Sequence, residues 1–456
     1  MSNKVDCGVM AAYDYDGGDV AIDIYHGLYT LQHRGQESCG IVTNDYVKLY
    51  TVKNKGLVNE VFNKDNLATL KGKIGVGHVH YGGDENDAIP PIMSQYCKGT
   101  MTIAMDGHLT NYAELRSELE QRGAIFQSSS HAEMIMNMIA VARTKLPSAE
   151  AAVYDTMQRL KGAFSAVLMS PKKLIAFRDP LGIRPLSIGK RGNRWFVASE
   201  TAAFDVIKAE KVCDVLPGEL IKIDETGVTH MADKVNPHPA HCIFEYVYFA
   251  RPDSMLDGNN VYQKRIAIGR ELFKAHPVKA DMVFGVPSSG LHFALGYSYE
   301  SGIPYGDGLF KNSYVGRTFI KGTSEERYEA VSIKLNPLRG AIEGKDVVIV
   351  DDSIVRGTTS ANLIRLLKDG GARTVHMRIA SPPFLWHCKF GSDIPDRKQL
   401  IAARMTVDEI RQQIGADTLG YLPVEAFENI GLTPNEHCEA CFTGVYPDEQ
   451  NETKKK

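Results

Sequence analysis

The fold of the C-terminal half is decided by Val347-Val348-Ile349-Val350-Asp351-Asp352-Ser353-Ile354-Val355-Arg356-Gly357-Thr358-Thr359. Its apolar start predicts a buried strand, and Ser360 to Lys368 predicts a helix that ends at Gly370-Gly371. Ligands of open α/β sheets bind at the carboxyl ends of strands, and helix N-termini bind phosphate. The stretch therefore predicts a site for a ribose 5-phosphate, with the two carboxylates holding ribose and Mg²⁺. The alternative is an acidic turn that only caps a helix.

Composition bounds the class of protein. The 456 residues favour two domains, and a hydrophobic content of 43% supports sizeable cores. A net charge of −3 leaves no electrostatic footprint for nucleic acid. No apolar run reaches the roughly 18 residues of a membrane span, and the first residues resemble no signal peptide, so a cytoplasmic protein is expected. Eight cysteines in such a chain indicate metal binding or catalysis rather than disulfides.

Two patterns follow one another along the chain. The first half combines two helical patterns, Ala21–His33 and Ala132–Leu146, with short strands, which predicts layered sheets with helices packed outside. After a proline-containing connector near residues 235–240, strands alternate with helices, which predicts a parallel sheet. The expected elements there are the strands Asp281–Val286, Asp346–Val350 and Thr374–Ile379 and the helix Leu291–Ser301.

Two further segments suit a phosphorylated ligand. Gly285-Val286-Pro287-Ser288-Ser289-Gly290 joins a strand to a helix with small residues, so its backbone N–H groups can approach a diphosphate. Lys311 to Ile320 mixes cations with an aromatic residue and a glycine, as a lid would, and Lys334 lies in the polar segment that follows. The alternatives are an ordinary strand-to-helix turn and a solvated loop.

Together these segments resemble the amidophosphoribosyltransferase family, whose members replace the diphosphate of phosphoribosyl diphosphate (PRPP) with an amino group. Matching stretches span almost the whole chain: Leu31-Gln32-His33-Arg34-Gly35-Gln36-Glu37, Arg178-Asp179-Pro180-Leu181-Gly182-Ile183-Arg184-Pro185-Leu186, Tyr248-Phe249-Ala250-Arg251-Pro252-Asp253-Ser254, Tyr314-Val315-Gly316-Arg317-Thr318-Phe319-Ile320 and Val350 to Ser360.

The resemblance implies an α/β protein of two domains. Residues 1–6 would be a propeptide, and residues 7–236 an N-terminal-nucleophile glutaminase-like domain of the α+β class, with four αββα layers. Residues 237–456 would be a type I phosphoribosyltransferase domain with a parallel sheet and a cysteine-containing tail. It further implies formation of 5-phosphoribosylamine and diphosphate, with nitrogen from glutamine or ammonia, as the first step of de novo purine synthesis. A homotetramer inhibited by purine nucleotides is also implied.

The resemblance also implies residue roles in the transferase site. Asp351 and Asp352 would hold ribose and Mg²⁺, and Ser289 would contact diphosphate and metal. The 5-phosphate would be held by Ser353, Arg356, Gly357, Thr358 and Thr359, and PRPP would also meet Lys311, Tyr314, Arg317 and Lys334. Two positions depart from the family pattern: Ser288 replaces an Asp and Ser313 replaces an Arg.

Four cysteines of the second half form one Cys-x-x-Cys pair, Cys438 and Cys441, and two single residues, Cys242 and Cys388. Their spacing leaves zinc, an iron–sulfur cluster and isolated buried thiols open. The resemblance implies a structural [4Fe–4S] cluster on these four cysteines. Cys39, Cys97 and Cys213 are expected to be packing thiols.

The resemblance gives Cys7 the role of nucleophile, together with Arg34 and Gly107 as catalytic residues. A terminal cysteine can use its own α-amine as the base, so cleavage between Asp6 and Cys7 is predicted.

The glutamine site departs from the family at three positions. His80 replaces an Arg that pairs with the α-carboxylate, His131 replaces an Asp for the α-ammonium, and Asp106 replaces the Asn of the oxyanion hole. Histidine replaces a bidentate Arg poorly, and a protonated His131 would repel an ammonium. An ionised Asp106 would oppose a developing oxyanion.

Three functions therefore stay open: a glutamine-using amidophosphoribosyltransferase, a transferase that uses ammonia because its glutaminase domain is inactive or retargeted, and a PRPP- or nucleotide-sensing regulator.

Overall fold

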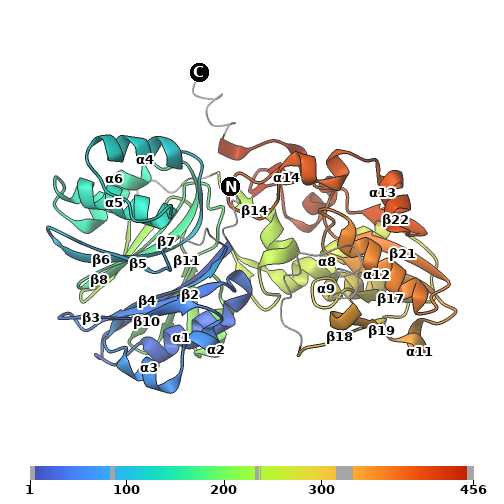
Figure 1. The fold of residues 1–456 in the computed structure, drawn as a ribbon, viewed down its shortest axis with the longest axis horizontal. Helices are drawn as coiled ribbons and strands as arrows, with labels where there is room; N and C mark the ends of the chain where they lie inside the picture. Colours follow the sequence, from blue (N-terminus) through green and yellow to red (C-terminus); the bar gives the residue numbers. More distant parts are fainter. Residues whose placement is uncertain (1–5, 83–87, 232–235, 237, 315–331, 449–456) are drawn as a thin grey trace.

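The computed structural model describes residues 6–82, 88–231, 236, 238–314 and 332–448, which form two lobes of layered sheets and helices (Figure 1). The N-terminal lobe contains two antiparallel sheets. The seven-stranded sheet has the order β11 (Glu210–Asp214), β9 (Ser187–Arg191), β10 (Arg194–Ala198), β1 (Asp6–Asp14), β4 (Ile74–Tyr81), β2 (Ser38–Asn44), β3 (Leu49–Lys55). The six-stranded sheet has the order β13 (Gly227–Met231), β12 (Leu220–Asp224), β8 (Lys173–Arg178), β7 (Gly162–Ser170), β6 (Gly99–Leu109), β5 (Ile92–Tyr96).

Helices cover both outer faces of this sandwich (Figure 1). One side carries α1 (Ala21–Thr30), α2 (Val58–Val61), α3 (Lys64–Thr69) and α7 (Ala202–Val206), and the other α4 (Tyr112–Gln121), α5 (His131–Arg143) and α6 (Ala149–Met157). Alternate residues of β1 point to opposite faces of the sheet. Met10 packs against the helices, whereas Val9 and Ala11 pack between the two sheets. The predicted four-layer αββα arrangement is confirmed.

The C-terminal lobe is built on a parallel sheet of order β17 (Met282–Gly285), β20 (Asp346–Asp351), β21 (Thr374–Ile379), β22 (Thr418–Tyr421). Val348 and Val350 of β20 pack with α8 (Val261–Ala275) and α9 (Leu291–Ser301). Val347 and Ile349 pack with α12 (Thr358–Asp369) and α13 (Val407–Ile414) on the opposite face. Both faces are buried, which is why this strand reads as an uninterrupted apolar run. The predicted parallel sheet is confirmed.

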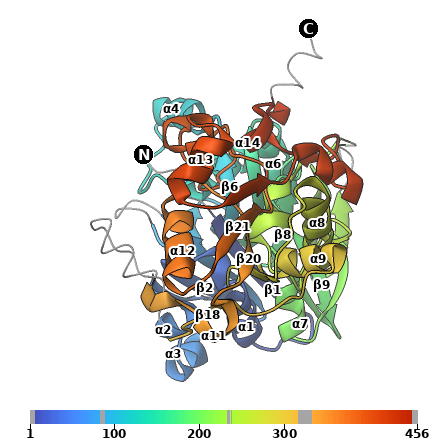
Figure 2. The same ribbon diagram turned by 90° about the vertical axis from the view of Figure 1, so that its right-hand side faces the viewer.

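Short elements complete the lobe. Strands β18 (Leu309–Lys311) and β19 (Leu335–Pro337) pair antiparallel, as do β15 (Met255–Leu256) and β16 (Asn259–Asn260), and the helical turn α11 (Arg339–Ile342) follows β19. Strand β14 (His241–Cys242) pairs in parallel with β23 (His437–Cys438), just before α14 (Ala440–Thr443), so the chain's end returns to the start of this lobe. Helices α8 and α9 pack side by side (Figures 1 and 2). Within the described residues, no helix is long and apolar enough to cross a membrane.

Two predicted helix boundaries differ from the observed ones because of the local backbone geometry. Helix α1 ends at Thr30 because Gln32–Arg34 forms a separate 3₁₀ turn, η1. Helix α12 begins at Thr358, two residues before the predicted start, because Gly357 caps it in the left-handed region with φ 80°. A Cβ at Gly357 would also lie 2.8 Å from the Ile401 side chain. Gly357 therefore fixes the start of the helix at the candidate phosphate site.

Candidate functional site

The ends of β17 and β20 bring the predicted sugar-phosphate residues together. Ser289 donates a hydrogen bond from Oγ to Asp351 Oδ1 at 3.0 Å, and Ser353 donates from Oγ to Asp352 Oδ2 at 2.6 Å. The two loops touch closely, because a Cβ on Gly290 would lie 2.0 Å from the carbonyl oxygen of Val350. Two segments about 60 residues apart in sequence therefore form one oxygen-rich edge.

The two neighbouring carboxylates of this edge are buried, so their negative charges would repel each other. Asp351 and Asp352 are both buried, and the backbone N–H of Asp352 donates to Asp351 Oδ1 at 2.9 Å. Burial, and then the neighbouring Asp352, raise the pKa of Asp351 well above its ordinary value. A cation at this edge would relieve the repulsion, and the hard oxygen donors suit Mg²⁺.

The phosphate side of the edge is open to solvent. Thr358 and Thr359 are exposed in the first turn of α12, where backbone N–H groups lack helical partners. Arg356 is exposed as well, but its guanidinium donates to Gln399 Oε1 at 2.6 Å. The loop from Ser353 to Thr359 therefore presents N–H groups and hydroxyls to a ligand, while Arg356 is held to a neighbouring segment.

The structure places the residues predicted to form a lid in different surroundings. Lys311 donates to Ser288 Oγ at 3.2 Å, so its ammonium lies beside the loop that follows β17. Tyr314 is 99% exposed. Lys334 accepts, through its carbonyl oxygen, a bond from the Asn312 N–H at 2.9 Å. Arg317 lies outside the described residues, so its predicted role stays a prediction.

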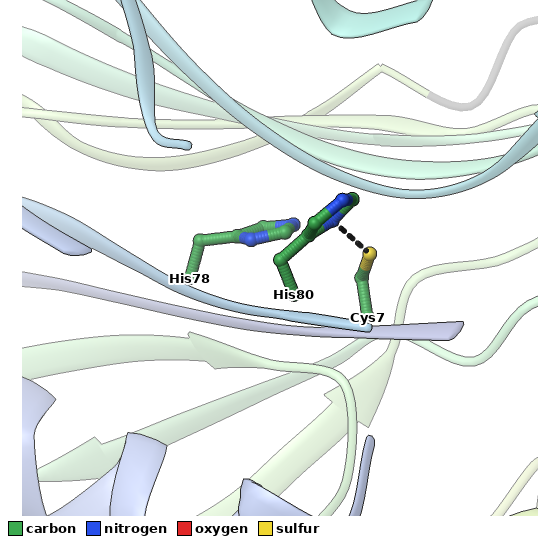
Figure 3. Close-up of side chains that lie close together, drawn as sticks. All are labelled: Cys7, His78 and His80. Atoms are coloured by element: carbon green, nitrogen blue, oxygen red, sulfur yellow. Dashed lines mark hydrogen bonds between the residues drawn. The ribbon is translucent and has the colours of Figure 1, made fainter. Parts of the chain in front are cut away.

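In the N-terminal lobe, Cys7 lies in β1 opposite His80 of β4 (Figure 3). His78 and His80 alternate with Val79, which packs on the helix side, so both imidazoles project between the two sheets. Cys7 Sγ lies 3.2 Å from His80 Nδ1. The Cys7 thiol is therefore one partner of the His80 ring.

Asp106 lies beside the same cysteine. The backbone N–H of Cys7 donates to Asp106 Oδ1 at 3.2 Å, and Arg34 Nη1 lies 3.6 Å from Asp106 Oδ2. Burial raises the pKa of Asp106, against the attraction of Arg184 and Arg34. Gly107 follows with φ 123°, and a Cβ there would lie 2.2 Å from the Ala163 carbonyl oxygen, so only glycine fits.

His131 belongs to a separate ring cluster at the start of α5. Its ring centroid lies 4.4 Å from those of both His108 and Tyr112, and its Nδ1 accepts from the Leu109 N–H at 2.9 Å. Burial, and then His108, lower the pKa of His131 to about 3. Burial therefore favours the neutral ring of His131, which carries no charge to attract or repel an ammonium.

Arg34 is the centre of a buried charge network. It donates to Glu200 and, through Nη2, to Glu245 Oε2 at 2.6 Å. Burial opposes ionisation of Glu200, but the charges of Arg34 and His33 outweigh it and hold the pKa of Glu200 below its ordinary value. Its other carboxylate oxygen accepts from the Arg251 N–H at 2.8 Å. The network therefore joins the cysteine pocket to the start of the transferase lobe.

The four cysteines of the second half converge. Cys242 and Cys438 are paired in register between β14 and β23, and Cys388 packs in the same small core. Burial, and then Cys438, Cys242 and Cys388, raise the pKa of the Cys441 thiol well above its ordinary value. Four tetrahedral ligands of one zinc ion would have sulfurs about 3.8 Å apart. Within the described residues, no three of these sulfurs come within 4.8 Å of one another, so the site is wider than a single zinc ion requires.

Several site residues could not be picked out from the sequence. His78 and His108 were missed because each lies in an apolar strand, where a core position is the usual explanation. Glu200 and Glu245 were missed because their partner Arg34 is 166 and 211 residues away. For the histidines, the spacing of two residues between His78 and His80 was an available signal, since it places both on one face of a strand.

Comparisons with known proteins agree with this geometry. Residues 82–206 match the glutamine amidotransferase domain family, and residues 253–380 match the phosphoribosyl transferase domain family. The amidophosphoribosyltransferase of Methanothermobacter thermautotrophicus is 45% identical over 97% of this chain and 94% of its own length. That of Bacillus subtilis is 42% identical over 97% and 94%.

Comparison with solved structures shows a similarity to the same family. The glutamine PRPP amidotransferase of B. subtilis, complexed with ADP and GMP, superposes with a TM-score of 0.91 at 42% identity, covering 97% of each chain. The resemblance to the family is thereby confirmed, and this chain belongs to the amidophosphoribosyltransferases.

Proposed function

We propose that this chain forms 5-phosphoribosylamine and diphosphate from PRPP at the edge formed by Ser289, Asp351, Asp352 and the start of α12. The observation that carries the proposal is the contact between the Ser289 loop and the paired carboxylates, beside an open helix N-terminus. Ribose and metal would meet the carboxylates, and the 5-phosphate would meet the loop from Ser353 to Thr359. Arg356 would have to leave Gln399 to reach the ligand.

The chain's residues would act mainly by positioning and electrostatics. Attack of ammonia at the anomeric carbon builds positive charge on the ribose ring as diphosphate leaves. Asp351 and Asp352 lie where they could stabilise that charge. Mg²⁺ held by these carboxylates and Ser289 would neutralise the leaving diphosphate. Lys311, Tyr314, Arg317 and Lys334 would close over the anion.

Relatives named amidophosphoribosyltransferase support glutamine as the nitrogen donor, and we propose that its use is weakened in this chain, so that ammonia can take its place. His80 is engaged with Cys7, and neutral His131 is stacked among rings, so neither side chain supplies a charge for a glutamine head group. Asp106 would stand where the family has its oxyanion-hole Asn, and losing one oxyanion-hole donor costs about 10²–10³ in rate. Glutaminase catalysis by Cys7, Arg34 and Gly107 would persist only weakly. Cleavage between Asp6 and Cys7 stays a prediction, which intact-mass measurement tests.

Cys242, Cys388, Cys438 and Cys441 would hold a [4Fe–4S] cluster. The breadth of the site favours the cluster over one zinc ion. Its role would be structural, fastening the chain's end to the connector. Absorbance near 400 nm that is lost in the Cys438→Ser variant would support this assignment; iron-free protein from anaerobic expression would contradict it.

Purine nucleotides are proposed as inhibitors, because the B. subtilis structure is complexed with ADP and GMP. A homotetramer is proposed as the assembly on the family resemblance alone. Light scattering with and without GMP tests the assembly, and the transferase assay tests inhibition.

The deciding experiment supplies PRPP and Mg²⁺ with either glutamine or an ammonium salt and measures diphosphate release. Release that is much faster with ammonium than with glutamine supports the proposal. Equal release with both donors would restore glutamine as the donor, and release with neither, despite PRPP binding, would make the chain a sensor.

A further inference from the structure

Cys7 and His80 face each other as a nucleophile and its base would. Their strands pair with these two residues directly opposite, and the His80 ring and the Cys7 thiol point toward one another (Figure 3). Cys7 Sγ lies 3.2 Å from His80 Nδ1, which is within the range for a nucleophile and the base that activates it. A neutral imidazole has one nitrogen with a lone pair, which can accept the thiol hydrogen.

The burial of Cys7 calls for a local proton acceptor. The thiolate, not the thiol, is the nucleophile of a cysteine. Cys7 is 1% exposed, so its thiol proton has no direct route to solvent. His80 is only partly buried, so its ring can take the proton from the thiol and exchange it with the surroundings.

The other available base, the α-amine of a terminal cysteine, is compromised by Asp106. The Cys7 nitrogen lies 3.2 Å from Asp106 Oδ1. A carboxylate at that distance favours the protonated form of an amine, and an ammonium has no lone pair with which to accept a proton. In a chain that retains Asp6, the same nitrogen is a peptide N–H, which is not a base either.

Two charges favour an ionised Asp106 in a cleaved chain. Arg34 Nη1 lies 3.6 Å from Asp106 Oδ2, and the new ammonium at Cys7 would lie beside Oδ1. Burial of Asp106 opposes ionisation, but each opposite charge within a few ångströms favours it. The carboxylate and the ammonium would therefore hold each other in their charged forms.

We propose that His80 is the base that activates Cys7, and that Asp106 keeps the α-amine out of this role. The two departures from the family then compensate for each other, because Asp106 removes one base and His80 supplies another. This inference deepens the proposed weak amide hydrolysis in the N-terminal lobe, and it rests on Cys7 being the nucleophile there. It also makes cleavage after Asp6 dispensable for activation of the thiol.

The reaction at an amide would run in two halves. The thiol proton passes from Cys7 Sγ to His80 Nδ1 as the sulfur attacks the carbonyl carbon. The C–N bond then breaks, and the imidazolium gives the proton to the leaving nitrogen, which yields ammonia and a thioester. Water next attacks the thioester and gives a proton to Nδ1. The C–S bond breaks, and the sulfur takes that proton back as the acid leaves.

The test is the rate at which iodoacetamide alkylates Cys7 in the full chain at pH 7. Digestion and mass spectrometry score the Cys7 peptide, both with and without the residues that precede it. We expect His80→Gln and His80→Asn to slow this alkylation by at least about tenfold, because an unactivated cysteine is only a few per cent thiolate at pH 7. His80→Asn keeps a hydrogen-bonding group near the position of Nδ1, so it tests the loss of the base with little loss of contact.

Two controls show that the effect is local. The exposed Cys97 should be alkylated at the parental rate in every sample. His26→Gln changes an exposed histidine of the same lobe and should leave the Cys7 rate unchanged. Equal Cys7 rates in the parent and in both His80 variants, including no reaction in any of them, would overturn the assignment of the base.

Adding Asp106→Asn to His80→Gln tests the role of the carboxylate. In chains that begin at Cys7, the α-amine should then recover most of the lost alkylation rate, whereas chains that retain Asp6 should stay slow. Cleaved His80→Gln chains that react as fast as the parent would overturn the role of Asp106. The assay uses neither glutamine nor PRPP, so its failure and the failure of the proposed function are seen separately.

Discussion

Arg34 donates from Nη2 to Glu245 Oε2 at 2.6 Å, and both side chains are buried. The two residues lie 211 positions apart, one in the sandwich and the other at the start of the π-helical turn η2 (Glu245–Phe249), which follows β14 in the transferase lobe. Because Arg34 also bonds Glu200 and lies beside Asp106, a change in one lobe alters charges that the other lobe contacts.

Removing Glu245 should destabilise the protein strongly. Glu245→Ala leaves Arg34 buried with one fewer counter-charge, and breaking a buried pair in this way costs about 3–5 kcal/mol. The urea midpoint of unfolding measures the effect. Lys274→Ala is the matched control, because Lys274 is exposed and solvent screens its ion pairs with Glu271 and Glu300, so its loss should change the midpoint far less. Similar midpoints for the two variants would contradict the structural role of Glu245.

The Asp351→Asn variant should gain thermal stability and lose PRPP binding. Burial and Asp352 raise the pKa of Asp351, so the folded state holds a proton that the unfolded state releases as pH rises above about 4. Stability contributed by this group is therefore present at low pH and lost as pH rises toward its raised folded pKa. In Mg²⁺-free buffer at pH 8, Asp351→Asn should melt at a higher temperature than the parent.

Calorimetry on the same Asp351→Asn protein should detect no PRPP uptake in the presence of Mg²⁺. A lower melting temperature combined with normal PRPP uptake would remove Asp351 from the site.

Three substitutions should restore glutamine use. His80→Arg, Asp106→Asn and His131→Asp together return the family's residues to the pocket. Glutamine-dependent diphosphate release should rise by at least about 100-fold, since one oxyanion donor alone is worth about 10²–10³. The ammonium-dependent rate of the same sample normalises the measurement. An unchanged ratio of the two rates would place the defect elsewhere.

His131 should make stability depend on pH. Its folded pKa of about 3 lies below the ordinary 6.5, so below pH 6.5 the unfolded chain binds a proton that the folded protein does not. Its contribution is intact above pH 6.5 and declines as pH falls toward 3. Between pH 7 and pH 5 the parent should lose about 2 kcal/mol more than His131→Asn, from about 1.5 units at 1.36 kcal/mol each. Parallel stability curves for the two proteins would show that the ring titrates normally.

Local sequence patterns were sufficient to predict much of the fold. Val347 to Val350 alternate between two covered faces, so their continuous apolar run was enough to predict a central parallel strand. The helix Leu291–Ser301 and the strand Thr374–Ile379 have the predicted bounds, because glycine or loop residues end them locally. The Asp351–Thr359 loop was predictable for the same reason: strand, acids, glycine and helix start are contiguous.

Residues whose roles depend on distant partners were not predictable. Whether His131 carries a charge depends on burial and on His108, and neither is visible in the sequence around it. Cys97 was expected to pack but is exposed, because a cysteine's surroundings cannot be read from its identity. The proximity of Cys7 to His78 arises from strand pairing across about 70 residues, which no local pattern encodes.

The pairing of β14 with β23 has a consequence for biogenesis. His241 and Cys242 acquire their strand partners, His437 and Cys438, only after 196 further residues have been synthesised. The sandwich can bury its cores before that moment, so we expect the pairing of β14 with β23 to follow the sandwich during synthesis. A chain truncated before His437 would leave β14 without its strand partner.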